Sequence, residues 1–250
     1  MTMPENTLPG AKLLSRDDTE AQYMISFGEH AFWLSISARA NAAPRPVFVF
    51  SGHGGTGSTN NLNSCEITAQ FRRAMLADGF AFICAVCRPD AWGDPASSNE
   101  TLAAAAFCRE HLFHVPDKLT LFGFSMGGLG ALMFAARNPE NTARVVDIFG
   151  ITDLADFADE GKYPEELALL EREELLRRAP CRFPEKYEKL PLLIIHGTED
   201  AIVPSSYSER FYKKLQKLNA PCRFISVPGY GHQNEILAPA GDAVKSFLEG

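Results

Sequence analysis

The residues best suited to chemistry in this chain centre on a serine between two glycines. Residues 123–127 read G-x-S-x-G, and Ser125 lies where a predicted strand at 118–124 gives way to a predicted helix at 126–137. The glycines leave room for a sharp turn that exposes the serine hydroxyl. That hydroxyl is a poor nucleophile unless a base accepts its proton and a carboxylate orients the base. With both partners present, the motif predicts attack by Ser125 on an acyl carbonyl.

Two loops further along the chain supply an acid and a base in that order. Asp200 lies after a predicted strand at 191–197, and His232 lies after a predicted strand at 222–229. Parallel strands bring their C-terminal ends to one edge of a sheet, so both loops should meet Ser125 there. We expect His232 to accept and later return the serine proton, and Asp200 to fix the imidazole tautomer.

Other acids and histidines suit these roles less well. Glu199 is adjacent, but the shorter Asp200 side chain suits the Gly-x-x-Asp spacing from Gly197, and Asp153 is the reserve acid. The remaining histidines lie in a predicted hairpin, at a helix end, at the end of a buried strand or in a glycine loop that precedes the serine: His30, His111 and His114, His196, and His53.

A glycine-rich loop, SGHGGTGS at 51–58, follows the strand predicted at 47–50. Its backbone N–H groups could face the oxyanion that forms when a serine attacks a carbonyl. We expect one donor from Met126 and a second from His53, with Gly55 or Thr56 as alternatives. A phosphate-binding loop is the competing interpretation, and the absence of the lysine of G-x-x-x-x-G-K argues against it.

The loop at 87–98 should open on the same edge as Ser125. Arg88 and Trp92 are candidates for the wall of a substrate pocket, Trp92 for an apolar part and Arg88 for an anionic part. The alternative for each is structural: a solvated arginine, and a tryptophan that covers the end of the sheet.

The elements that must position these residues alternate between strands and helices, which is typical of a mostly parallel sheet covered on both faces. About eight strands are predicted, opening with an antiparallel hairpin at 21–37 after a loose lead-in at 1–20. The other strands are 47–50, 80–86, 118–124, 144–150, 191–197 and 222–229, and the helices are 64–78, 98–113, 126–137, 205–218 and 233–249.

The pattern indicates one domain spanning 1–250, interrupted at 151–190 by a stretch without a strand. The charged run at 163–178 has leucines at helical spacing, with Pro164 in a position suited to a first helical turn. This insert is either a small lid over the sheet edge or an ordinary crossover helix with a long approach.

Composition limits the possible partners. The chain has 24 basic and 31 acidic residues, a net charge of −7, and 46% hydrophobic residues. No basic cluster indicates nucleic-acid binding, and no apolar run is long enough for a membrane helix. The first residues lack the pattern of a signal peptide, so we expect a cytoplasmic protein with free thiols. Cys84 and Cys87 form a CxxC without a second pair, which favours packing over a metal site.

Together these residues resemble the α/β-hydrolase superfamily over about 45–245. The elbow FGFSMGG and the stretch PLLIIHGTEDAIVP are similar to the catalytic domains of the prolyl-oligopeptidase and acyl-esterase branch. The family's glycine loop begins with histidine, whereas Ser51 stands there in this chain.

The resemblance implies a serine hydrolase that works through an acyl-enzyme on a small-molecule acyl substrate and needs no metal or organic cofactor. The sequence has no counterpart of the β-propeller of full-length prolyl oligopeptidases, so small esters are the expected substrates. The alternatives are an aminopeptidase or acylaminoacyl-peptidase activity on short peptides, and a non-catalytic binding protein on the same fold.

Overall fold

A twisted sheet of nine strands runs through the part of the chain, residues 10–39 and 43–250, that the computed structural model describes. Its order is β1-β2-β3-β5-β4-β6-β7-β8-β9. The first four strands in that order pair antiparallel and the rest pair parallel. The strands are β1 (Ala11–Arg16), β2 (Glu20–Phe27), β3 (His30–Ser37), β4 (Arg45–Phe50), β5 (Phe80–Ala85), β6 (Leu119–Phe124), β7 (Thr142–Ile148), β8 (Leu192–Gly197) and β9 (Cys222–Val227). The prediction of a mostly parallel sheet with an antiparallel start is confirmed.

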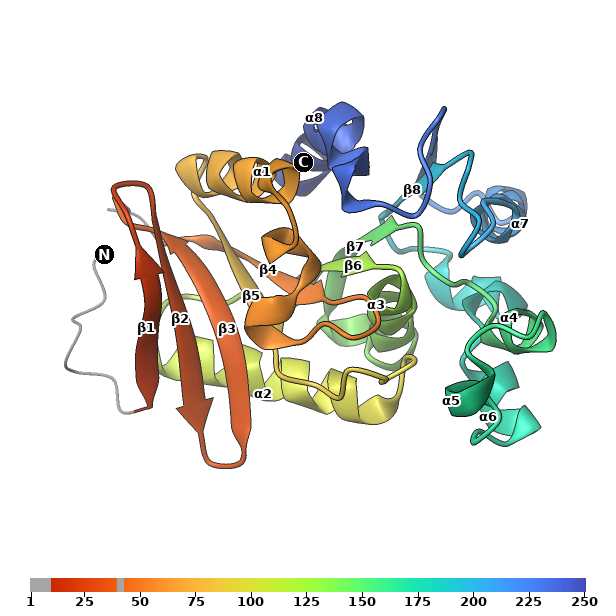
Figure 1. The fold of residues 1–250 in the computed structure, drawn as a ribbon, viewed down its shortest axis with the longest axis horizontal. Helices are drawn as coiled ribbons and strands as arrows, with labels where there is room; N and C mark the ends of the chain where they lie inside the picture. The colour runs from red at the N-terminus through yellow and green to blue at the C-terminus, as the bar shows by residue number, and fades with distance from the viewer. Residues whose placement is uncertain (1–9, 40–42) are drawn as a thin grey trace.

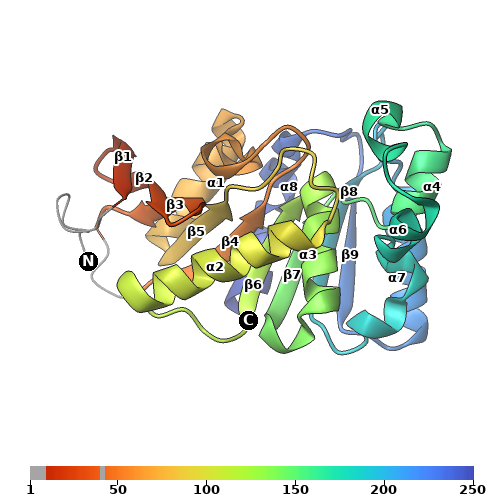
Figure 2. The ribbon, with the colours of Figure 1, turned by 90° about the horizontal axis from the view of Figure 1, so that it is seen from below.

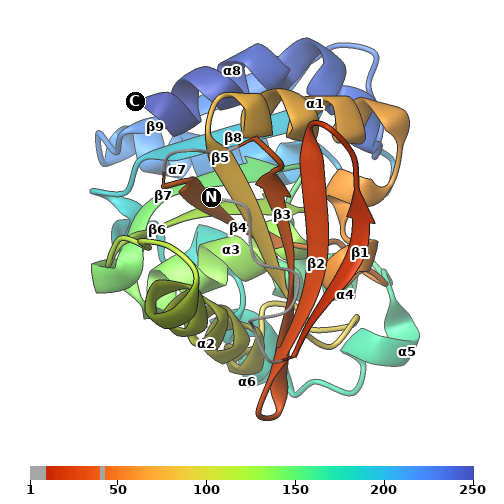
Figure 3. The same cartoon turned by 90° about the vertical axis from the view of Figure 1, so that its left-hand side faces the viewer.

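Helices cover both faces of the sheet, which explains why its central strands are continuous apolar runs (Figures 2 and 3). One face is covered by α1 (Glu66–Ala77) and α8 (Leu237–Glu249), whose apolar residues share one buried cluster. The other is covered by α2 (Pro95–His111), α3 (Met126–Arg137) and α7 (Ser206–Lys217), which share a second cluster. No helix in the described residues is long and apolar enough to cross a membrane.

The expected lead-in at 1–20 is wrong where the structure describes it. Residues Ala11–Arg16 form β1, an extra strand that lengthens the hairpin and brings the count from about eight to nine. As the edge strand, β1 has little burial to impose an alternating pattern, and Leu13 and Leu14 are each about two-fifths exposed. Residues 1–9 lie outside the described residues.

The insert at 151–190 is a chain of short helices beyond the end of the sheet (Figure 1). The single helix suggested by the leucine spacing is wrong, because the chain breaks at 168–171 and exposes Leu169. Leu167 and Leu175 are buried instead on either side of the break. The pieces are α4 (Leu154–Asp159), α5 (Pro164–Leu167) and α6 (Arg172–Arg177), followed by 3₁₀ turns at Pro180–Arg182 and Pro184–Tyr187.

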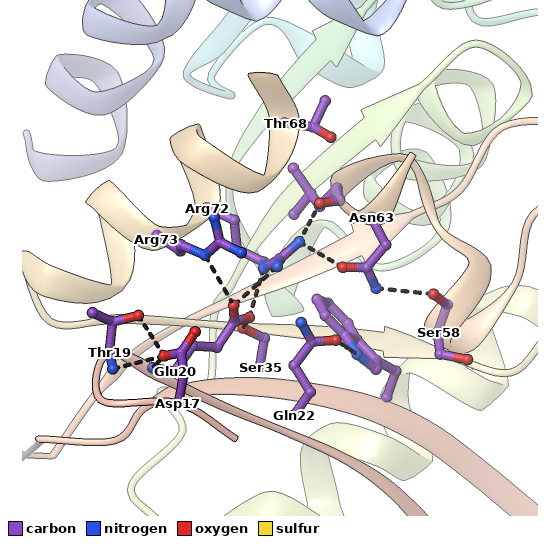
Figure 4. Close-up of polar contacts among 12 residues, drawn as sticks. Asp17, Thr19, Glu20, Gln22, Ser35, Ser58, Asn63, Thr68, Arg72 and Arg73 are labelled. Carbon is purple, nitrogen blue, oxygen red and sulfur yellow. Dashed lines mark hydrogen bonds and ion pairs between the residues drawn. The ribbon is translucent and has the colours of Figure 1, made fainter. Parts of the chain in front are cut away.

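A buried ion pair ties the hairpin to α1 (Figure 4). Both nitrogens on one side of the Arg72 guanidinium donate to Glu20, at 2.6 and 2.9 Å, and Ser35 donates to the same carboxylate at 2.6 Å. The third nitrogen of Arg72 donates to the backbone oxygen of Leu62 and to Asn63. Removing one partner of such a buried pair typically costs about 3–5 kcal/mol. The hairpin, α1 and the turn at 61–63 are therefore held as one unit.

Candidate active site

Ser125 occupies a strained turn between β6 and α3. Its φ of 55° and ψ of −122° lie outside the regions that a non-glycine residue normally adopts. The flanking glycines are required by space. A Cβ on Gly123 would lie 2.2 Å from the backbone oxygen of Gly127, and a Cβ on Gly127 would lie 2.1 Å from that of Phe50. The backbone N–H of Ser125 donates to the oxygen of Ile148 at 2.9 Å, which ties the turn to β7.

The structure brings Ser125, His232 and Asp200 into one hydrogen-bonded chain. His232 Nε2 lies 2.8 Å from Ser125 Oγ, and His232 Nδ1 lies 2.7 Å from Asp200 Oδ2. The residues come from three loops that follow the parallel strands β6, β8 and β9. In the sheet, β7 lies between β6 and β8, and β9 is next to β8. Such an arrangement allows a serine proton to pass to an imidazole that a carboxylate holds in orientation.

Both oxygens of the Asp200 carboxylate accept hydrogen bonds. The backbone N–H groups of Ile202 and Val203 donate to Oδ1 at 2.9 and 2.8 Å. Burial alone would raise the pKa of Asp200, but the contacts of His196 and His232 with its carboxylate outweigh burial and hold the pKa below its ordinary value. The carboxylate therefore stays ionised at neutral pH.

His196, which the sequence excluded as the base, is a second histidine on that carboxylate. Its Nε2 lies 2.8 Å from the backbone oxygen of Val203 and 3.2 Å from Asp200 Oδ2. Both are acceptors, so Nε2 carries a proton, and Nδ1 lies 2.8 Å from Ser208 Oγ. His196 is fully buried, and it contacts the same oxygen of Asp200 as His232 does. The only sequence signal for this contact is its spacing of four residues from Asp200.

Between Gly52 and Thr56 of the glycine loop, the N–H of Gly52 donates to Asn61, and one backbone donor has no acceptor among the described residues. The N–H groups of Gly54, Gly55 and Thr56 donate to Pro89, Gly52 and Thr59 respectively. Within residues 10–39 and 43–250, those of His53 and Met126 donate to no other group. The geometry favours His53 over the alternatives Gly55 and Thr56 as the companion of Met126.

The phosphate-loop interpretation fails for a different reason from the missing lysine. Residues 52–57 do have the spacing G-x-G-x-x-G, which in a dinucleotide site opens a long helix. Here the loop runs into two 3₁₀ turns, Gly57–Thr59 and Asn61–Asn63, and α1 begins only at Glu66. The helix N-terminus that would bind a phosphate is missing from that position.

Residues of the insert hold the side chain of His53. Glu166 of α5 lies 2.7 Å from His53 Nε2 through one oxygen and accepts a hydrogen bond from Trp92 Nε1 at 2.6 Å through the other. The rings of Trp92 and Tyr163 contact the imidazole, with centroids 5.4 and 4.7 Å away. The insert therefore reaches across the end of the sheet to the glycine loop.

The two pocket candidates are placed differently. Trp92 is 3% exposed and packs beneath the insert with Phe157 and Leu167. Arg88 is at the surface, 3.5 Å from Asp94, and lines a cavity of about 30 Å³ behind the glycine loop together with Met126. A space of that size holds about one or two water molecules. Of the pair, only Arg88 is open to solvent.

In the described parts of the chain, no three His, Cys, Asp or Glu side chains are arranged so that they could hold a metal ion. Cys84 and Cys87 are free thiols, and burial raises the pKa of both.

A buried carboxyl group, Asp147 of β7, lies beneath the serine turn. Only glycine fits beside its Oδ1 at two positions, because a Cβ on Gly128 or Gly150 would lie 2.1 or 2.0 Å from that oxygen. Neither oxygen has a hydrogen-bond partner among the described residues. Burial raises the pKa of Asp147 to about 7, and the neighbouring His196 opposes the shift. The group is thus largely uncharged below neutral pH.

Replacing this carboxyl group should change how stability depends on pH. In the unfolded chain Asp147 ionises near 3.8, whereas in the folded protein it keeps its proton up to about pH 7. The free energy of unfolding of the native protein therefore falls as pH rises through this window. We expect the stability of Asp147→Asn, relative to that of the native protein, to rise by a few kcal/mol between pH 5 and pH 8. Urea denaturation at the two pH values measures the difference.

An exposed acid provides the control for that comparison. Asp159→Asn, at the end of α4, should leave the pH dependence as it is in the native protein. If Asp147→Asn and the native protein lost stability in parallel as pH rises, burial of the Asp147 charge would not be the cause.

Comparison with known proteins places this architecture among hydrolases. A model described as the prolyl oligopeptidase family matches residues 90–245. The uncharacterized peptidase YtmA of Bacillus subtilis (strain 168) is 25% identical over 141 residues, which are 49% of this chain and 51% of that protein. The chain thus matches about half the length of this curated relative.

Solved structures share the fold at low sequence identity. An S-formylglutathione hydrolase from Agrobacterium tumefaciens superposes with a TM-score of 0.72 at 20% identity, covering 95% of this chain and 99% of the other. A truncated carbohydrate esterase from gut microbiota gives 0.73 at 20%, covering 95% and 98%. The acylaminoacyl peptidase of Pyrococcus horikoshii gives 0.73 at 17%, covering 92% of this chain and 41% of the other. These similarities establish the fold.

Proposed function

Because the chain belongs to the prolyl oligopeptidase family and has an α/β-hydrolase fold, we propose that it is a serine hydrolase that cleaves small carboxylic esters. The observation that carries the proposal is the continuous chain of hydrogen bonds from Ser125 through His232 to Asp200, with lengths of 2.8 and 2.7 Å. The strained backbone of Ser125 supports it, because strain of this kind is found where a side chain must be held exposed for reaction.

In the proposed mechanism, Ser125 Oγ attacks the ester carbonyl while His232 Nε2 accepts its proton. The charge on the resulting tetrahedral oxygen is stabilised by the backbone N–H groups of Met126 and His53. His232 then gives the proton to the leaving alcohol as the carbon–oxygen bond breaks, which leaves an acyl-enzyme on Ser125. Water repeats the sequence, with His232 again as base, and releases the acid and the free serine. Asp200 stays ionised and stabilises the imidazolium in both halves.

Two observations favour esters over amides. Two acids of the insert that could anchor a peptide amino terminus are already engaged: Glu166 by His53 and Trp92, and Asp156 by arginines. Two of the neighbours whose whole length this chain nearly spans are named as an S-formylglutathione hydrolase and a carbohydrate esterase. Amide cleavage on short peptides is the second candidate, since the curated relative is named as a peptidase.

The insert at 151–190 is proposed to act as a small lid. Its α5 helix contacts the glycine loop and the 87–98 loop through a single carboxylate, Glu166, which is the arrangement expected of a latch. An ordinary crossover would have no need of such contacts at the edge of the sheet where Ser125 lies.

A panel of chromogenic substrates tests the reaction class. We expect p-nitrophenyl esters to be hydrolysed with a higher kcat/KM than aminoacyl p-nitroanilides, because Glu166 and Asp156 of the insert are engaged by other side chains, and we expect the acetate to be preferred to the octanoate if the substrates are small esters. Release of p-nitrophenol or p-nitroaniline is followed by absorbance for the native protein and for Ser125→Ala.

The outcomes separate the candidates. A preference for the anilides would move the assignment to a peptidase. If the native protein hydrolysed neither class faster than Ser125→Ala, the proposed function would be overturned.

A further inference from the structure

The side chain of Asn61 connects the two loops that carry the proposed oxyanion donor and the proposed base. Its Oδ1 accepts hydrogen bonds from the backbone N–H of Gly52 at 2.7 Å and from Ser51 Oγ at 3.1 Å. Its Nδ2 donates to Asn234 Oδ1 at 2.9 Å. The orientation of the amide is fixed by chemistry, because a backbone N–H can only donate and must therefore face Oδ1.

On the side of the glycine loop, this contact holds the Ser51–Gly52 peptide, which is next to the Gly52–His53 peptide that carries the His53 N–H. Asn61 holds the N–H of Gly52, and the oxygen of Gly52 accepts the N–H of Gly55 at 3.0 Å. A trans peptide is planar, with its C=O and N–H pointing in opposite directions, so fixing the Gly52 oxygen also fixes the direction of the His53 N–H. A Cβ on Gly52 would lie 3.3 Å from Asn61 Oδ1, which shows how closely the loop rests on this side chain.

On the other side, the contact reaches the loop of His232. Asn234 is two residues from the base, and its Nδ2 donates to Ser64 Oγ at 2.8 Å. Ser64 Oγ in turn donates to the backbone oxygen of Asn61 at 2.8 Å. Asn61, Asn234 and Ser64 thus form a closed ring of hydrogen bonds that joins residues about 170 positions apart in the sequence.

Asn61 is itself held in place from the hairpin. It begins the 3₁₀ turn Asn61–Asn63, whose Leu62 oxygen and Asn63 side chain both accept from Arg72. Figure 4 shows this turn held between Arg72, which is anchored on Glu20, and the backbone of Ser58, to which Asn63 donates at 2.9 Å.

We propose that Asn61 is a positioning residue that sets the placement of the His53 N–H relative to His232, through Gly52 on one side and Asn234 on the other. The proposal rests on the proposed function of the serine site. It assigns no contact between Asn61 and substrate, so loss of Asn61 should affect the chemical step more than substrate binding.

The test compares Asn61→Ala and Asn234→Ala with a matched control. Asn63→Ala removes the same amide from the same turn, but the hydrogen bonds of the Asn63 side chain go to Arg72 and to Ser58, at the far end of the glycine loop, and not to Gly52 or to the His232 loop. On p-nitrophenyl acetate we expect Asn61→Ala to lower kcat by about 10- to 100-fold with KM within about 3-fold, since removing an oxyanion donor outright costs about 10² to 10³. Asn234→Ala should lower kcat less, and the double variant no further than Asn61→Ala alone. Asn63→Ala should keep kcat within about 3-fold, whatever its Tm.

Failure takes a distinct form. The proposal is overturned if Asn61→Ala keeps at least about a third of native kcat, or if Asn63→Ala loses as much as Asn61→Ala. If the native protein shows no hydrolysis that depends on Ser125, the proposed function falls instead. Amide hydrogen exchange then still tests Asn61: faster exchange at 52–56 and 232–236 in Asn61→Ala, but not in Asn63→Ala, supports its positioning role, and unchanged exchange overturns it.

Discussion

Ser125→Ala should lower kcat by about 10⁵- to 10⁶-fold on any ester that the native protein hydrolyses, because no other group can then form the acyl-enzyme. Alanine removes one oxygen and keeps the Cβ, so the turn at φ 55° is no more strained than with serine. Steady-state hydrolysis and stoichiometric labelling by a fluorophosphonate measure the loss.

A serine outside the site provides the matched control. Ser246 lies exposed on α8, and Ser246→Ala should hydrolyse and label as the native protein does. Activity of Ser125→Ala above about 1% of native would show that another residue performs the reaction. If the native protein bound an ester without turning it over, and Ser125→Ala bound it equally well, the fold would serve binding alone.

Asp200→Asn should lower kcat by about 10⁴-fold, close to the effect of the same change in other serine triads. Both carboxylate oxygens face donors: backbone N–H groups at Oδ1, and His232 and His196 at Oδ2. An asparagine has only one acceptor atom to offer. With its NH₂ group toward the histidines, His232 Nδ1 must accept, so Nε2 keeps a proton and cannot take one from Ser125. With the NH₂ group toward the backbone, two N–H groups lose their acceptor.

The pH profile and a second acid complete this test. Since the pKa of Asp200 is held below its ordinary range, protonation of Asp200 should not cause the fall of native activity toward mildly acidic pH. Asp153, the reserve acid of the sequence interpretation, pairs instead with Arg182 at 3.0 Å and caps α4. Asp153→Asn should therefore keep kcat within about 10-fold. An equal loss in both variants would contradict the assignment of Asp200.

The sequence was informative where local pattern and fold topology coincide. Ser125, Asp200 and His232 each follow an apolar strand, and the order of those strands places their loops on one edge before any coordinate is known. Residues whose role depends on a distant partner carry no such pattern. His196 looks like the end of a buried strand, and Asn61 looks like one more polar residue in a loop. Their contacts become visible only in the folded chain.

The elements that were missed have a common physical cause. The edge strand β1 packs against one neighbour, so its side chains need not alternate, and AKLLSR reads as a loop. Glutamate, arginine and leucine, which all favour helix, occur along the whole charged run at 163–178, so helix propensity alone does not show the break at 168–171. There the helix ends where it does because Leu167 and Leu175 are both buried in one apolar cluster.

The distance along the chain between the side chains of the proposed triad also bears on how the protein folds. His232 bonds to Ser125 across 107 residues and to Asp200 across 32, and its loop is positioned by β9, which can pair only after β8 is in place. Contacts so far apart in sequence form late, because the closing of long loops is entropically unfavourable. In a growing or refolding chain, Ser125 therefore has no base beside it until β9 pairs with β8. Recovery of catalysis would report the end of folding, whereas recovery of helix signal would report an earlier stage.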